Sequence, residues 1–164
     1  MGNITDNFVV RIIIIIVITI LVSNAMFMAF DNSWSLVQKR GELHLGYNKS
    51  YDNASFVLEL ATEVSKRIGV NLMPQAIDWS EKEKALDAGM VDCLWGGVKR
   101  LDSEDNSMTF SKPYMKDGYL VGFRRGNVAL KNKVQVALVA TIKDGTAKNI
   151  ANRWFTKDVI LEPK

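Results

Sequence analysis

The feature that most constrains the fold is an alternation, from Trp34 onward, between short segments with a strand pattern and amphipathic segments with a helix pattern. Leucine and tyrosine occupy every second position of residues 42–47, which predicts a strand with one buried face. Apolar residues recur at helical spacing over residues 56–68, and Gly69 follows them, where a left-handed residue commonly ends a helix. The first unit is therefore a strand followed by a helix.

The next unit repeats this order. Residues 70–77 predict a second strand, after which either Asp78 or Ser80 is placed to cap a helix that ends near Gly89. Residues 91–95 predict a third strand, and a strand that follows a helix in this way indicates a right-handed crossover and a parallel sheet. Later segments predict two short strands and two helices, over residues 108–110, 119–124, 130–145 and 146–155. The predicted fold class is α/β, a mostly parallel sheet flanked by helices.

The chain has room for one such domain. With 164 residues, 48% of them hydrophobic, it can bury one ordinary core. The formal charge is +3, with lysines and arginines scattered among acids, which argues against a nucleic-acid partner. The lone Cys93 excludes an internal disulfide, and its apolar strand predicts a core position rather than a reactive thiol.

The amino terminus indicates a compartment. Arg11 precedes the apolar residues 12–22, and Ser23-Asn24-Ala25 supplies the small residues that a signal peptidase accepts. A retained anchor is the rival interpretation, because uncharged sequence continues to Phe30 and about nineteen helical residues reach about 28 Å. A buried core helix is disfavoured, since the isoleucines leave no polar face. Residues 1–30 are thus a signal peptide or a membrane anchor, and the body is periplasmic or extracellular, either free or tethered through residues 12–30.

No group of residues predicts catalysis or a cofactor. His44 is the only histidine and lies on the polar side of its strand, so we expect it to be exposed or hydrogen-bonded rather than catalytic. Metal-ligand spacing of cysteines and histidines is absent from the sequence. The acidic residues Asp102, Glu104 and Asp105 are expected to form a solvated loop rather than a metal site.

Several motifs after Trp34 occur in a characteristic order. They are Gly41-Glu42-Leu43-x-Leu45-Gly46, Asp78-Trp79, Ala85-Leu86-x-x-Gly89-x-Val91-Asp92, Trp95-Gly96-Gly97, Phe110-Ser111-x-Pro113-Tyr114-Met115 and Lys143-Asp144-Gly145-Thr146. In this order they resemble the family 3 extracellular solute-binding proteins, the receptors that hand polar amino acids to ABC importers. The resemblance covers residues 34–164 and implies a type II periplasmic binding protein-like fold, in which two lobes clamp the ligand.

The resemblance also implies that one lobe is missing. Residues 119–132 resemble the segment by which the chain returns from the second lobe, yet they follow almost directly on Met115, where the outgoing crossing belongs. We therefore expect a single lobe, with the second absent between about residues 115 and 119. A site on one lobe is open to solvent, so its affinity for a ligand should be weak. Exposed apolar surface at the former hinge would favour self-association.

Five residues occupy positions that meet the ligand in the family. Asn48 and Tyr51 stand where a polar residue and an aromatic ring do so, and Gly97 matches the glycine whose carbonyl receives the ammonium group. Lys99 stands where a serine or threonine helps binding, and Glu104 aligns with the arginine that grips the α-carboxylate.

The Glu104 exchange reverses the chemistry of that position. A guanidinium offers paired donors to a carboxylate, whereas Glu104 offers only acceptors and a like charge. At about 4 Å, with an effective dielectric near 20, the repulsion is about 4 kcal/mol. Lys99 or Arg100 could supply a substitute cation, although solvated loop charges are the commoner arrangement.

Three classes of function remain open at this point. The first is a solute-binding component of an amino-acid ABC transport system, with weak or lost ligand binding and a permease as partner. The second is a secreted or tethered interaction module that no longer binds amino acids. An enzyme ranks last: relatives of this fold include a dehydratase, but neither paired carboxylates in a pocket motif nor a Ser/His/Asp set is recognisable here.

Overall fold

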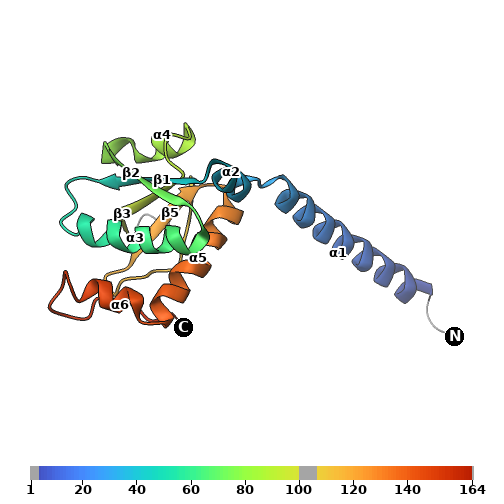
Figure 1. The fold of residues 1–164 in the computed structure, drawn as a ribbon. Helices are drawn as coiled ribbons and strands as arrows, with labels where there is room; N and C mark the ends of the chain where they lie inside the picture. Colours follow the sequence, from blue (N-terminus) through green and yellow to red (C-terminus); the bar gives the residue numbers. More distant parts are fainter. Residues whose placement is uncertain (1–3, 100–106, 164) are drawn as a thin grey trace.

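Five strands form one sheet in the computed structural model, which describes residues 4–99 and 107–163 (Figure 1). In chain order the strands are β1 (Glu42–Asn48), β2 (Asn71–Ile77), β3 (Cys93–Lys99), β4 (Met108–Phe110) and β5 (Tyr119–Arg124). Their spatial order is β2-β1-β3-β5-β4. β1 is parallel to both β2 and β3, and β5 is antiparallel to both β3 and β4, so four strands share one direction. The predicted α/β lobe with a mostly parallel sheet is confirmed.

Helices cover both faces of this sheet. In chain order they are α1 (Ile4–Phe30), α2 (Ser33–Arg40), α3 (Ala54–Ile68), the 3-10 turn η1 (Trp79–Glu81), α4 (Lys82–Asp87), α5 (Val128–Lys143) and α6 (Thr146–Ala151). α3, α5 and α6 lie on one face and α4 on the other (Figure 1). The larger core includes Leu43, Phe56, Trp95 and Leu138, whereas a smaller cluster under α4 includes Leu86, Leu94 and Val98.

Helix α3 follows its sequence pattern closely. Phe56, Leu60 and Val64 are buried, as their helical spacing predicts. Gly69 adopts φ 81° at the carboxyl end, where its N–H bonds the carbonyls of the last turn. At the other candidate cap, Asp78 rather than Ser80 supplies the oxygen, since its Oδ1 accepts from Ser80 N at 2.9 Å.

Two elements differ from the sequence prediction by more than two residues at one end. The strand expected over residues 91–95 begins at Cys93 and continues to Lys99, with an irregular pairing to β5 between Trp95 and Lys99, where Gly96 and Gly97 adopt positive φ angles. The last helix, expected to reach Phe155, ends at Ala151, and turns follow it.

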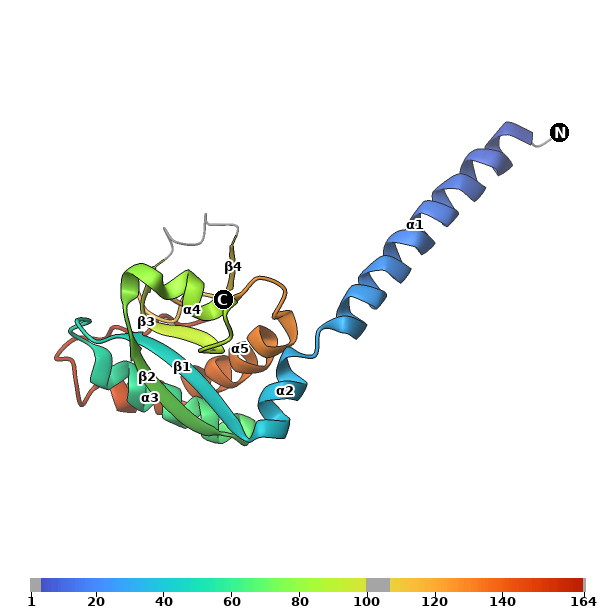
Figure 2. The same ribbon diagram turned by 90° about the horizontal axis from the view of Figure 1, so that it is seen from above.

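Helix α1 extends away from the body (Figure 2). The side chains of residues 8–23 are exposed, including the isoleucine run. Across the residues that the structure describes, no helix combines the length and apolarity needed to cross a bilayer.

A tight turn occupies the place where the sequence predicts the missing lobe. Gly118 N donates to Met115 O at 2.9 Å, and Tyr114 N donates to Tyr119 O at 3.1 Å. The chain therefore passes directly from the segment after β4 into β5. Lys116 N also donates to Val159 O, which attaches this turn to the carboxyl-terminal segment.

Candidate functional site

The candidate site lies at the carboxyl ends of β1 and β3. These strands are parallel neighbours, so Asn48 at the end of β1 and Lys99 at the end of β3 belong to the same edge of the sheet. Asn48 Oδ1 accepts a hydrogen bond from Ser50 N at 2.9 Å, and the backbone carbonyl of Asn48 accepts one from Tyr51 N at 3.1 Å. This turn carries Tyr51 back toward β3.

Tyr51 packs between Gly96 and Tyr119. A Cβ placed on Gly96 would lie 3.4 Å from Tyr51 Cδ1, so the ring rests on backbone that carries no side chain. The centroids of the Tyr51 and Tyr119 rings are 5.2 Å apart with a tilt of 58°. The two rings form an aromatic wall that joins the loop after β1 to the start of β5.

Gly97 is covered by an aromatic ring that the sequence did not assign to the site. Its φ is +127°, and a Cβ there would lie only 2.8 Å from Trp79 Cζ2. Both the backbone angle and the contact require glycine at this position. The sequence contained a signal, since Trp79 is part of the Asp78-Trp79 motif, but nothing in that motif indicated which strand the ring would contact.

Lys99 is held beside Tyr119. The two residues are partners in the β3–β5 register, and Lys99 Nζ lies 5.0 Å from the centroid of the Tyr119 ring. This cation–π contact keeps a positive charge at the strand end. Tyr119 was not among the predicted site residues, because a pairing between strands twenty residues apart in sequence leaves no local pattern.

The floor beneath this site contains buried polar atoms. Tyr51 Oη, Tyr114 Oη and Trp95 Nε1 are buried, and none has a hydrogen-bond partner within residues 4–99 and 107–163. The Trp95 and Tyr114 rings meet edge to face, with centroids 5.9 Å apart. Burial raises the pKa of Tyr51 and of Tyr114, so both hydroxyls stay neutral at physiological pH and can donate hydrogen bonds.

The structure thus places four of the predicted site residues, Asn48, Tyr51, Gly97 and Lys99, along one edge of the sheet. Glu104 and Arg100 lie outside the described residues, so the reversed charge remains a sequence prediction. Within the described part of the chain, no three His, Cys, Asp or Glu side chains gather in a way that could hold a metal ion.

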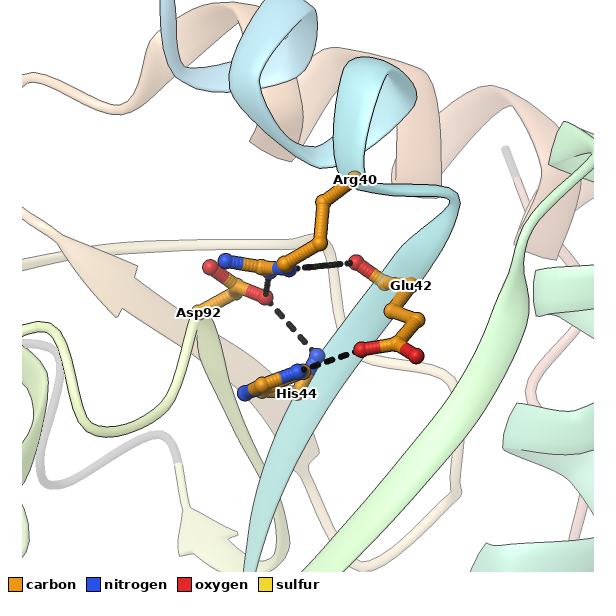
Figure 3. A network of polar contacts seen from close by, with 4 residues as sticks. All are labelled: Arg40, Glu42, His44 and Asp92. Carbon is orange, nitrogen blue, oxygen red and sulfur yellow. Dashed lines mark hydrogen bonds and ion pairs between the residues drawn. The ribbon is translucent and has the colours of Figure 1, made fainter.

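A separate polar network lies at the opposite ends of the strands (Figure 3). Asp92 Oδ2 accepts from Arg40 Nη2 and from His44 N, the latter at 2.7 Å, while His44 Nε2 lies 3.1 Å from Glu42 Oε2. Arg40 ends α2, His44 and Glu42 belong to β1, and Asp92 precedes β3. The network joins these three segments, and His44 is hydrogen-bonded at a distance from the candidate site.

Comparisons with known proteins agree with this fold. The family model for bacterial extracellular solute-binding proteins, family 3, matches residues 46–157. A histidine-bound ABC uptake transporter substrate-binding protein from Streptococcus pneumoniae is 17% identical with a TM-score of 0.73, covering 82% of this chain and 100% of that one. No curated protein sequence matches the chain.

Two further solved structures are similar. A polar amino acid ABC uptake transporter substrate-binding protein from Streptococcus thermophilus is 16% identical with a TM-score of 0.71, covering 79% of this chain and 91% of that one. The arginine-bound form of domain 1 from TmArgBP is 19% identical with a TM-score of 0.57, covering 62% of this chain and 94% of that one. At these identities the likeness establishes the fold.

Proposed function

The chain belongs to the family 3 bacterial extracellular solute-binding proteins, and on that basis we propose that it binds a small polar amino acid for an ABC transport system. The observation that carries the proposal is the family match over residues 46–157, which includes β3 and the loop after β1. Structural neighbours with histidine or arginine bound support the same class of ligand.

The arrangement of the site supports amino-acid chemistry. In the proposed complex the carbonyl of Gly97 accepts from the ammonium group, and Lys99 supplies a cation for the carboxylate. Tyr51 and Tyr119 contact the ligand side chain, because their rings form the wall between the two strand ends. Asn48 positions this wall through its turn.

We propose that binding is weak. The chain turns at residues 115–118, where the family's crossing to a second lobe belongs, so contacts from one side alone must offset the lost translational freedom of the ligand. The carboxylate of Glu104 replaces a guanidinium and repels the ligand's α-carboxylate. A dissociation constant of about 1 mM corresponds to about 4 kcal/mol, which one open face can supply.

Titration calorimetry with arginine, histidine and other polar amino acids tests the proposal. We expect weak heats with at least one compound, at least fivefold tighter binding in Glu104→Arg because a bidentate donor returns, and loss of binding in Tyr51→Ala. Lys157→Gln is the control, since it removes a surface charge downstream of α6. Unchanged binding in both site variants would contradict the assigned roles.

The second candidate is an interaction module without a small-molecule ligand, favoured by the turn at residues 115–118. It predicts no heat with any amino acid, even for Glu104→Arg. The same titration therefore separates the two functions.

We also propose that the body acts outside the cytoplasm, where the family's extracellular members act. Residues 12–22 and the small residues after them support an export signal. Mass spectrometry of the exported protein tests this: a mature chain beginning near residue 26 is expected, and a chain that is never exported would contradict it.

A further inference from the structure

Strand β2 is an open edge of the sheet. It stands first in the spatial order of the strands, and within the part of the chain that the structure describes it pairs with β1 alone. Residues 73–76 are exposed, and Met73 is 45% exposed. The backbone groups on the outer side of β2 are therefore accessible to another strand, and a second copy of the chain carries a strand that matches them.

The sequence of β2 contains no charge that would oppose such pairing. It reads Asn-Leu-Met-Pro-Gln-Ala-Ile. Edge strands are commonly protected by charged side chains, by a bulge, by shortness or by proline. β2 is seven residues long, and its register with β1 is unbroken from end to end. Among these protections, β2 itself contains only the proline, Pro74.

The hydrogen bonds of the sheet establish which way Pro74 faces. In a parallel pair the N–H and the C=O of one residue point to the same side, and successive residues alternate between the two sides. Asn71 N donates to Gly41 O at 2.9 Å, so Asn71 faces β1. Along the register the odd-numbered residues of β2 therefore face β1, and the even-numbered ones face outward: Leu72, Pro74 and Ala76. The same alternation turns His44 of β1 away from β2, and His44 N accordingly donates to Asp92 Oδ2 at 2.7 Å.

Pro74 removes the donor at the centre of the outward-facing row. Proline has no N–H, and a sheet tolerates it where the missing N–H would face solvent, so the pairing with β1 loses no hydrogen bond. A second copy that approached about a two-fold axis would place its own Pro74 opposite this one. An antiparallel pair of this kind normally exchanges two hydrogen bonds, and here both would be absent. The two proline rings would also occupy the space between the strands.

We infer that Pro74 keeps the sheet from extending into a second copy of the chain through β2. The exposed, uncharged edge would pair with itself if its central donor were present, and Pro74 prevents this without weakening the lobe. None of the candidate site residues belongs to β2, so the inference is independent of the proposed ligand binding.

Sedimentation velocity of the full chain over a range of protein concentrations tests the inference. Pro74→Val restores the N–H and adds a residue that favours strands, and Pro74→Thr restores the same donor with a less apolar side chain. We expect both variants to dimerise at a concentration lower than the wild type by about tenfold or more, because two hydrogen bonds return at the centre of the pair. The apolar α1 is present in every sample, so its contribution cancels in the comparison.

Two matched variants make the result specific to the outward donor. Gln75→Val adds the same side chain at the neighbouring position, whose N–H faces β1, and should sediment as the wild type does. Adding Ala76→Pro to Pro74→Val moves the missing donor to another outward-facing position and should reverse the association. Far-ultraviolet circular dichroism and thermal melting verify that each variant folds.

Amide hydrogen exchange at single-residue resolution supplies a test that begins with the wild type. The N–H groups of Leu72 and Ala76 should exchange faster than those of Met73 and Gln75, and they should become protected in the Pro74→Val dimer. Slow exchange of Leu72 and Ala76 in the wild type would mean that the edge is already paired and would overturn the inference. Association of Pro74→Val no stronger than that of the wild type or of Gln75→Val would overturn it as well.

Discussion

At the scale of single residues, Gly97 is the position where backbone and packing constraints coincide. Its φ of +127° disfavours any side chain, and Trp79 occupies the space that a Cβ would need. We expect Gly97→Ala to lower the free energy of unfolding, with about 1–3 kcal/mol from the backbone angle and a similar amount from overpacking. Urea denaturation measures the sum.

Gly126 supplies the matched control for this prediction. Its φ is +91°, but a Cβ there would meet nothing within 4 Å, so Gly126→Ala reports the backbone cost alone. Gly97→Ala should lower the free energy of unfolding more than Gly126→Ala does. The difference between the two variants should shrink when both are measured in a Trp79→Ala background. Equal costs in the wild-type background would mean that the Trp79 ring moves aside freely.

Four residues of the candidate site could be predicted from the sequence. Asn48 and Tyr51 follow one short motif, whereas Gly97 and Lys99 lie in or just after another, and the structure brings the two pairs to one edge. Trp79 and Tyr119 could not be assigned to it, because their contacts depend on how η1 and β5 lie against β3. Strand pairing and ring packing between distant segments leave no spacing pattern to read.

At the scale of elements, the sequence predicted the strands and the longer helices but missed one short helix, α2. The apolar spacing in α3 predicted the start of that helix to within two residues. The strands predicted over residues 108–110 and 119–124 match β4 and β5. α2 was not predicted, since eight residues form barely two turns and contain few apolar positions. Its position comes from contacts with α5, such as the one between Lys133 and Trp34.

Arg67 connects α3 to the corner between α5 and α6, and this connection predicts a pH dependence. Its Nη1 lies 2.5 Å from Asp144 Oδ2, and its Nη2 donates to Thr146 Oγ1 at 3.1 Å. The hydrogen bond from Arg67 and the N–H of Thr146 lower the pKa of Asp144 from 3.8 to about 2. A lowered carboxyl pKa stabilises the fold above pH 3.8, and this contribution is lost as the pH falls toward about 2.

Thermal melts between pH 5 and about pH 2 test this connection. Replacing Asp144 with Asn removes the titrating group, so the melting temperature of the variant should fall less steeply than that of the wild type within the window. Asp52→Asn, at an exposed position in the loop before α3, is the control for the loss of a surface carboxylate. Parallel curves for the wild type and Asp144→Asn would exclude a contribution from the Arg67 contact.

At the scale of the whole molecule, the proposed binding site of a single lobe has one open side. A second copy could cover it, because the half-buried rings of Tyr51, Tyr119 and Trp79 lie at the same edge of the sheet. Ligand binding and dimer formation would then be linked: the ligand strengthens the dimer by the same factor by which the dimer strengthens ligand binding.

This linkage predicts that the ligand increases dimer formation. Sedimentation velocity over a range of protein concentrations should detect a larger dimer fraction with arginine or histidine present than without it. Tyr119→Lys places a charge in the shared face and should abolish the ligand-dependent part, whereas Val136→Lys, at an exposed position on α5, should leave it intact. Comparing samples with and without ligand separates this effect from association through the apolar α1. Ligand binding whose affinity does not change with protein concentration would show that the open lobe binds alone.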